Sequence, residues 1–221
     1  MVSLVDLQEY CQGKRIIIVG NSSQMIGSNS RNIIDSYDIV VRINKGYQYR
    51  RTALSDSIGS KTHILAIGMK SAQLASTVIK SNSIDYILSP IIHSEILDYP
   101  NVYNVDNETY NLLKTSLGNY KPSTGISVYN FFNRFINFER LDLIGFDFFT
   151  SSTNQRNALG HLFVKDHDGE KEKEFFEDSK DPEKTKLYKL KGGVVKNTNN
   201  IPRYRDIQQK YSYNVKKVTK Q

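Results

Sequence analysis

Two of the four histidines of the chain, His161 and His167, lie six residues apart in the polar stretch HLFVKDHDGEKE. An imidazole titrates near neutral pH, which makes histidine the natural general base for a hydroxyl proton. Glu172 follows His167 by five residues, and a nearby carboxylate can fix the tautomer and orientation of an imidazole. We interpret these three residues as candidate catalytic residues. The alternative is a pair of solvated histidines in a loop.

A metal site competes with this interpretation in the same stretch. Asp166 and Asp168 form an Asp-x-Asp sequence, the pattern by which many nucleotide-sugar transferases hold a divalent ion. This pattern also recurs by chance, and here it lies far from the early strands of the chain. We therefore expect no metal and rank this alternative below the histidine base.

Neutral hydrogen-bonding side chains follow the first apolar run, at Gly20. The loop is neither a Walker loop, since no Gly-Lys-Ser/Thr sequence closes it, nor a GxGxxG loop. It offers the side chains of Asn21, Ser22 and Ser23. Their amide and hydroxyl groups can bind a phosphate or a ribose without carrying charge. An ordinary strand-to-helix loop explains the same residues.

Two further segments combine polar groups with the ends of expected elements. Arg42 and Asn44 close a buried apolar run, where a charged side chain faces a site or pairs with an internal carboxylate. In KPSTG, Ser123 or Thr124 would cap the following helix, and a helix N-terminus beside a hydroxyl also binds anions. Capping alone accounts for the second segment.

The elements that must position these residues follow an alternating pattern. Apolar runs of strand length, mostly without polar alternation, occur at 15–20, 37–43, 62–67, 85–89 and 140–146. Such runs are typical of strands buried on both faces. Helical patterns occur between them, at 69–82, 107–118 and 122–138. Strand and helix in alternation predict an α/β fold with a mostly parallel sheet covered on both sides, which binds ligands beyond the carboxyl ends of its strands.

The last third of the chain is more polar. After Phe149 we expect a lid-like loop, one helix after Asp168, a short strand near 187–190 and a weakly indicated helix from Pro202. We expect a single domain over 1–221, with a core of about 12–195 and a basic tail at 196–221. The length of 221 residues is sufficient for one sizeable core.

Composition narrows the class of protein. The sequence contains no run of eighteen apolar residues and no secretion signal, so we expect neither a membrane span nor export. A single cysteine, Cys11, excludes an internal disulfide, and we expect it to be a small buried hydrophobe. The net charge of +7 favours an anionic partner, although the basic tail is equally explained as a solubilising surface.

Four segments, taken in order, resemble the motifs of the animal-type sialyltransferases. VGNSSQMIGSNSRNIIDSYDIVVRINK resembles the long motif, and SIGSKTHIL resembles its continuation. PSTGISVYNFFNRFINFERLDLIGFDFF resembles the short motif, and HDGEKE resembles the very short motif, His-x4-Glu. The matches span roughly 15–172, with an unmatched middle at about 69–120. The resemblance implies a single Rossmann-like domain of the GT-A variant type.

The resemblance also implies roles for individual residues. It makes His167 the general base and places a preceding histidine, here His161, at the donor phosphate. It assigns Asn21 and Asn44 to the nucleotide. The other residues expected to line the donor site are Gly20, Ser22, Ser123, Thr124, Gly125, Gly145 and Phe146.

The activity implied is inverting transfer of a sialic acid from its cytidine monophosphate (CMP) ester to a glycan hydroxyl, without metal or other cofactor. A transferase for Kdo or another ulosonic acid, also activated by CMP, is the nearest alternative. A non-catalytic nucleic-acid-binding protein is a third, suggested by the basic charge and 14 tyrosines. Its aromatic residues are not interleaved with basic ones in any recognisable RNA-binding motif, so we expect no nucleic-acid partner.

Two features of the animal enzymes have no counterpart in the sequence. The disulfide that joins their long and short motifs cannot form with one cysteine, and we see no membrane anchor or stem. We therefore expect a compact microbial or viral relative that works in a reducing cytoplasm, where peripheral contact with a membrane is compatible with its charge.

Overall fold

We describe residues 2–44, 46–47, 55–68, 84–90, 100–149 and 167–190 of the computed structural model. The helix expected at 69–82, the segment 150–166 with His161 and Asp166, and the chain from 191 onward with its expected terminal helix lie outside these residues. Among the described residues, no helix has the length and apolar character needed to cross a membrane.

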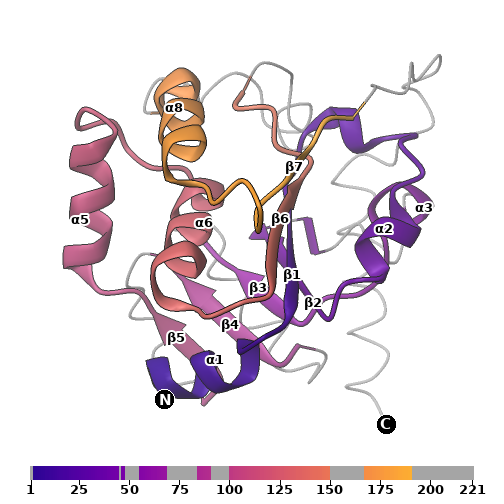
Figure 1. Cartoon of the computed structure of the whole chain (residues 1–221), viewed down its shortest axis with the longest axis horizontal. Helices are drawn as coiled ribbons and strands as arrows, with labels where there is room; N and C mark the ends of the chain where they lie inside the picture. Colours follow the sequence, from indigo (N-terminus) through magenta and orange to yellow (C-terminus); the bar gives the residue numbers. More distant parts are fainter. Residues whose placement is uncertain are drawn as a thin grey trace, which may run out of the picture.

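A parallel seven-stranded sheet forms the centre of the molecule (Figure 1). The strand order is β5-β4-β3-β2-β1-β6-β7, and all six pairings between neighbours are parallel. The strands are β1 (Arg15–Val19), β2 (Ile39–Ile43), β3 (Ile64–Ala66), β4 (Tyr86–Ser89), β5 (Val102–Asn104), β6 (Arg140–Ile144) and β7 (Leu187–Tyr188). The five expected strands and the short strand near 187–190 are confirmed. We missed β5, which is only three residues long.

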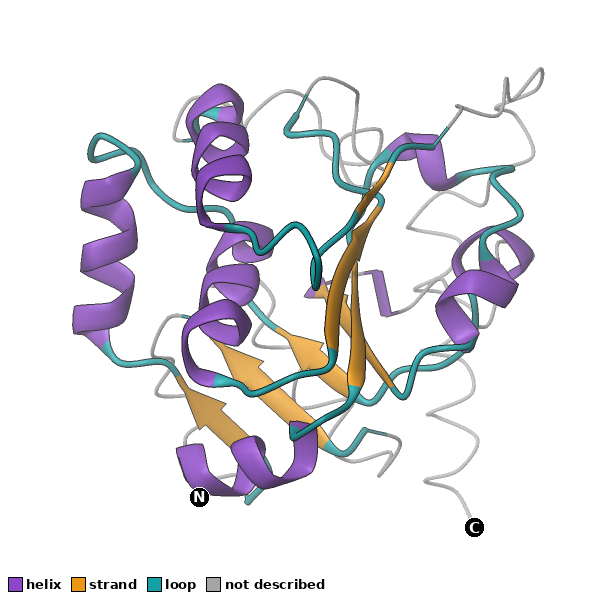
Figure 2. Cartoon of the chain, in the orientation of Figure 1, coloured by secondary structure: helices purple, strands orange, loops and turns teal. Residues whose placement is uncertain are grey.

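Helices cover both faces of the sheet, as Figure 2 shows by the purple helices on either side of the orange strands. In β1, Ile16 and Ile18 pack in one buried cluster, whereas Ile17 and Val19 pack in the other. The first cluster includes residues of α1 (Leu4–Cys11), α5 (Asn107–Ser116), α6 (Thr124–Phe135) and α8 (Gly169–Ser179). The second includes residues of η1 (Ser23–Met25), α2 (Arg31–Asp35) and α3 (Ser55–Ile58). The expected α/β fold is therefore confirmed.

The ends of the helices follow from capping residues. Ser123 caps α6 and Asp168 caps α8, each side chain accepting a hydrogen bond from an N–H of the first turn. We missed α1, although Ser3 and Asp6 form a capping box there. This helix adds the buried Leu7 and Cys11 to the hydrophobic core. Burial raises the pKa of the Cys11 thiol to about 12, as suits an inert hydrophobe.

The chain order of the strands reverses between β1 and β6, and the loops that leave these two strands touch there. The Gly20 N–H donates to the carbonyl oxygen of Ile144 at 2.7 Å. A Cβ on Gly20 would lie 2.3 Å from the backbone oxygen of Gly145, and Gly145 itself has φ +73°. Only glycine fits both requirements. Such a reversal point, at the carboxyl ends of the strands, is where α/β sheets bind ligands.

Candidate active site

The loop before α8 presents His167 to the start of the α6 region. Its Nδ1 lies 2.6 Å from the backbone oxygen of Lys121, and the side chain is partly buried. A carbonyl oxygen only accepts, so Nδ1 donates and therefore carries the ring proton. In the neutral imidazole, Nε2 then holds the lone pair. This assigned tautomer is the one in which Nε2 can act as a general base.

The loop after β6 contacts the same histidine. The Phe149 ring stacks on the His167 ring, with 5.6 Å between centroids and 7° between planes. Phe148 and Phe149 have φ values of 49° and 64°, in the left-handed region that bulky residues rarely adopt. Each such residue costs of the order of 1–3 kcal/mol and persists only where its surroundings hold it.

Glu172 joins α8 to the N-terminus of α6. It is 3 % exposed, and its carboxylate accepts hydrogen bonds from both the N–H and the hydroxyl of Ser123, each at 2.7 Å. Burial raises the pKa of Glu172 to about 7, and the two bonds from Ser123 oppose that rise. Glu172 thus fixes the helix start beside His167 through Ser123. Direct orientation of His167 by Glu172 stays a prediction.

A three-way contact joins the ends of β2 and β3 to the first residue of α6. The Asn44 amide donates from Nδ2 to the Thr124 hydroxyl at 3.3 Å, and its Oδ1 accepts from the Gly68 N–H at 2.7 Å. A Cβ on Gly68 would lie 2.4 Å from the Thr124 hydroxyl oxygen. Asn44 itself has φ +49°, which asparagine tolerates better than most residues. The expected site residues Asn44 and Thr124 are therefore adjacent.

Asn21 lies next to this contact. Its Nδ2 donates to the carbonyl oxygen of Ile43 at 3.1 Å, one residue before Asn44. A Cβ on Gly46 would lie 2.3 Å from Asn21 Oδ1. The loops after β1 and β2 are therefore packed together, with both asparagines at the carboxyl edge of the sheet.

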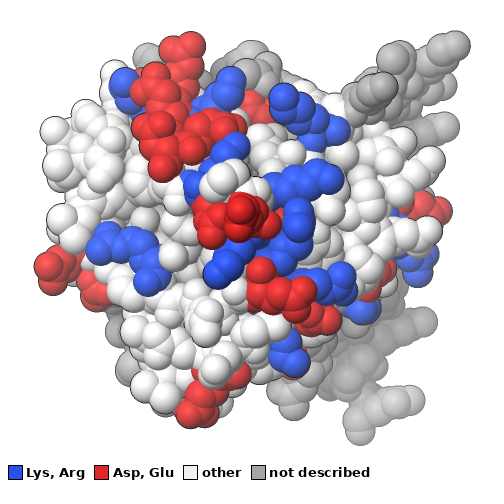
Figure 3. Space-filling model, viewed as in Figure 1, with Lys and Arg blue, Asp and Glu red and all other residues white. Residues whose placement is uncertain are grey.

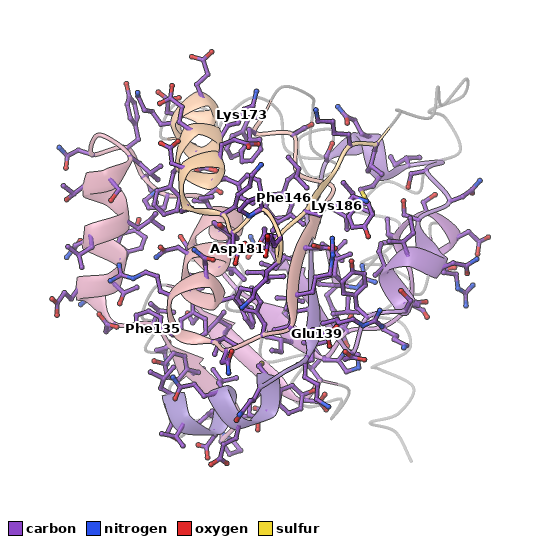
Figure 4. All side chains as sticks on the ribbon, viewed as in Figure 1. Phe135, Glu139, Phe146, Lys173, Asp181 and Lys186 are labelled. Atoms are coloured by element: carbon purple, nitrogen blue, oxygen red, sulfur yellow. The ribbon has the colours of Figure 1, made fainter. Side chains whose placement is uncertain are left out.

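The other expected donor-site residues link the loop after β1 and the helix α6 to the loop after β6. The Ser22 hydroxyl donates to Asp147 at 2.8 Å. A Cβ on Gly125 would lie 2.6 Å from the Phe146 ring. Figure 4 shows Phe146 between α8 and β6, near the carboxyl end of that strand. The expected residues of this site thus come together from four separate loops.

The Arg42 side chain does not face the site, which was one of the two positions expected for it. The side chain is 1 % exposed, and its guanidinium donates to the carbonyl oxygens of Ile58 and Lys61 and to the Thr62 hydroxyl. These donations satisfy carbonyls at the end of α3 and before β3. Arg42 therefore supports the strand that carries Asn44 from inside the protein.

Sequence reasoning missed four residues of the site: Lys121, Asp147, Phe149 and Gly68. A backbone carbonyl such as that of Lys121 gives no sequence signal. Gly68 directly follows an apolar run, and a glycine there can indicate close approach of another backbone or side chain. His161, expected at the donor phosphate, lies outside the described residues.

Charge is unevenly distributed around the site. In Figure 3, acidic side chains gather over α8, where Glu170, Glu174 and Glu177 are exposed. Basic side chains gather beside them, near the position at which Figure 4 labels Lys186. The described residues of this face thus form mixed patches, whereas a nucleic-acid interface presents a continuous basic one.

No cluster of three metal-ligating side chains occurs within the described ranges. Asp168, half of the Asp-x-Asp pattern, uses its carboxylate to accept from the Lys171 N–H at 3.1 Å as the cap of α8. Capping accounts for this aspartate. Asp166 lies outside the described ranges, so the metal alternative remains for experiment.

Comparison with known proteins agrees with this geometry. Residues 7–99 match the model of glycosyltransferase family 29 (sialyltransferase). A crystal structure of a mammalian sialyltransferase superimposes with a TM-score of 0.57 at 18 % identity, covering 86 % of this chain and 74 % of that one. The complex of a mammalian sialyltransferase with Gal-beta-1-3GalNAc-ortho-nitrophenol gives a TM-score of 0.55 with the same identity and coverage. No curated protein matches the sequence.

The family model matches less than half of the chain, and the solved structures, at 18 % identity, show a shared fold. This chain therefore has the fold of the mammalian sialyltransferases, and its match to the family-29 model over residues 7–99 agrees with the resemblance drawn from its motifs. The matched segment contains Asn21 and Asn44 but ends before Ser123 and His167.

Proposed function

We propose that the protein transfers a sialic acid from CMP-sialic acid to a glycan hydroxyl with inversion at the anomeric carbon. One observation carries the proposal: the Lys121 carbonyl holds His167 in the tautomer that leaves Nε2 as the basic atom, beside the start of α6. The family match and the neutral donor-site residues Asn21, Asn44 and Thr124 support the same chemistry.

In this reaction His167 Nε2 takes the proton of the acceptor hydroxyl as that oxygen attacks the anomeric carbon. The bond from the anomeric carbon to the phosphate oxygen breaks on the opposite face, and CMP leaves with the bonding electrons. General-base assistance contributes about 10²–10⁴ in rate. Orientation of the two substrates and stabilisation of the charge on the leaving phosphate supply the rest.

The donor phosphate is a diester with one negative charge, for which neutral hydrogen-bond donors suffice. The first N–H groups of an α-helix have no partner within that helix and point toward its N-terminus. In α6, the Ser123 N–H and hydroxyl already donate to Glu172. We therefore assign the phosphate to the N–H groups of Thr124 and Gly125, with Asn21 and Asn44 on the nucleoside side.

We expect selective binding of cytidine nucleotides. CMP at a hundredfold excess over Kd should stabilise the fold by about 2.7 kcal/mol, and UDP and GDP should do much less, as measured by thermal shift. Asn21→Ala and Asn44→Ala should each reduce the CMP shift, whereas Asn111→Ala, an exposed change on α5, should not. Equal shifts for all three nucleotides would refute the donor assignment.

We expect transfer to be independent of divalent metal, because a single phosphate charge can be balanced by neutral donors. Transfer or donor hydrolysis should continue at the same rate in EDTA, and the release of CMP measures that rate. If EDTA abolishes the reaction and Mn²⁺ or Mg²⁺ restores it, Asp166 and Asp168 become metal ligands. Asp168→Asn, which keeps an oxygen to cap α8, should leave the wild-type rate unchanged in either buffer.

The thermal shift, the release of CMP and a gel shift together separate the alternatives. A transferase for Kdo or another ulosonic acid would show the CMP shift but release CMP fastest from that donor. A nucleic-acid-binding protein would show no CMP shift and a salt-dependent gel shift instead.

A further inference from the structure

The loop after β6 carries an aromatic ring to the face of the proposed base. Phe149 and His167 are eighteen residues apart in the chain, yet their rings are nearly parallel, at 7° and 5.6 Å between centroids. Neither the motifs nor the resemblance gives Phe149 a role. The effect of this stack on His167 therefore has to be argued from the structure.

One hydrogen bond does not fix the plane of an imidazole. A carbonyl oxygen such as that of Lys121 accepts over a broad range of directions, and the χ2 torsion of histidine has broad minima. A ring lying flat against the imidazole removes the remaining rotation. The direction of the Nε2 lone pair then depends on both contacts.

We propose that Phe149 is a positioning residue for the transfer reaction, which sets the plane of His167 so that Nε2 points at the acceptor hydroxyl. This inference rests on the proposed function. Phe149 acts through His167 and does not itself exchange a proton.

The surroundings of Phe149 hold it in its unfavourable backbone conformation. Asp147 accepts from the Phe149 N–H through one carboxylate oxygen, at 3.2 Å, and from the Ser22 hydroxyl through the other, at 2.8 Å. A Cβ on Gly169, two residues after His167, would lie 2.0 Å from the Phe148 oxygen. The left-handed pair at Phe148 and Phe149 is thus fixed from the β1 loop and from the start of α8. Strain maintained in this way is typical of functional sites.

The test compares two substitutions that differ only in the ring. Phe149→Leu keeps an apolar side chain without the flat surface, and we expect kcat to fall about 10–100-fold with little change in the donor KM, because small misplacement of a catalytic group costs about that much. Phe149→Tyr should restore most of the rate. The control Tyr86→Leu removes a ring that meets Tyr10 edge-on, at the start of β4 and away from the loops that carry Phe149 and His167, and should leave kcat unchanged.

A second measurement reads the position of His167 without any substrate. A stacked ring shifts the NMR signals of imidazole protons, and the His167 signals are identified by their loss in His167→Ala. We expect Phe149→Leu to move them and Phe149→Tyr to keep them. A wild-type kcat in folded Phe149→Leu, or unmoved His167 signals, overturns the proposal. If Phe149→Leu does not fold, Asp147→Ala, which releases the Phe149 backbone, should give the same two changes.

The two readouts separate this inference from the proposed function. A wild-type protein without transfer activity contradicts the function, whereas the NMR comparison still decides whether Phe149 holds His167. A drop in kcat with unmoved His167 signals contradicts the positioning role alone.

Discussion

His167→Ala should lower kcat for transfer by about 10²–10⁴ and change the donor KM only modestly. In the proposed mechanism, the substitution removes the atom that takes the proton from the acceptor hydroxyl and leaves the proposed donor site, at Asn21, Asn44 and the start of α6, unchanged. The wild-type rate should fall at low pH, where the imidazole is protonated, and this acid limb should be absent from the variant. Steady-state kinetics over a pH series measure both effects.

The matched control is His167→Gln, which keeps an amide to donate to the Lys121 carbonyl but has no basic atom. We expect it to fold and to bind CMP like the wild type while remaining as slow as His167→Ala. A folded His167→Ala protein that binds CMP and keeps near-wild-type transfer would refute the proposed mechanism.

Glu172→Ala should lower the free energy of unfolding by roughly 2–4 kcal/mol, because it leaves the partly buried N–H of Ser123 without an acceptor, removes the partner of the Ser123 hydroxyl and opens a cavity. Chemical denaturation near pH 5.5 measures this loss. Glu172→Gln should cost far less. Its amide matches a protonated carboxyl, with the oxygen accepting from the Ser123 N–H and the nitrogen donating to the Ser123 hydroxyl oxygen.

The pH dependence has a definite sign. The pKa of Glu172 is about 7 in the folded protein against a model value of 4.5, so the folded state binds the proton more tightly than the unfolded chain does. The stability from Glu172 is fully present below about pH 4.5 and is lost as pH rises through about 7. Glu172→Gln should lack this decline and so should gain stability relative to wild type between pH 5.5 and 8. Parallel stability curves for the two proteins would contradict the assignment.

Much of the fold could be predicted because its strands are buried on both faces. Runs such as that of β1 are continuously apolar, and their alternation with helical patterns specifies a parallel sheet. Two short helices were missed for a physical reason: α2 and α3 have five and four residues, too few for a helical period to show. Their structure depends on contacts with the rest of the core.

The candidate site was only partly predictable. His167 and the asparagines were found because their types and neighbours indicate chemistry and a family. The bond between Glu172 and Ser123 spans 49 residues of chain, and the stack of Phe149 on His167 depends on a strained turn. The sequence associates Glu172 with His167, five residues away, and associates no partner with Phe149. The bond from Ser123 to Glu172 forms only when α6 and α8 pack together.

The contact of Gly20 with Gly145 also limits how this site can vary. The atom that a methyl group on Gly20 would meet belongs to the backbone, so trimming a side chain elsewhere makes no room for it. Gly145 has the further restriction of its positive φ, and a methyl group there would press on Met25. In a library of random variants, a residue larger than glycine at Gly20 or Gly145 should not be compensated by any second substitution. The junction between the loops after β1 and β6 should therefore stay the same among functional variants. Any change in substrate preference should come from the side chains around it.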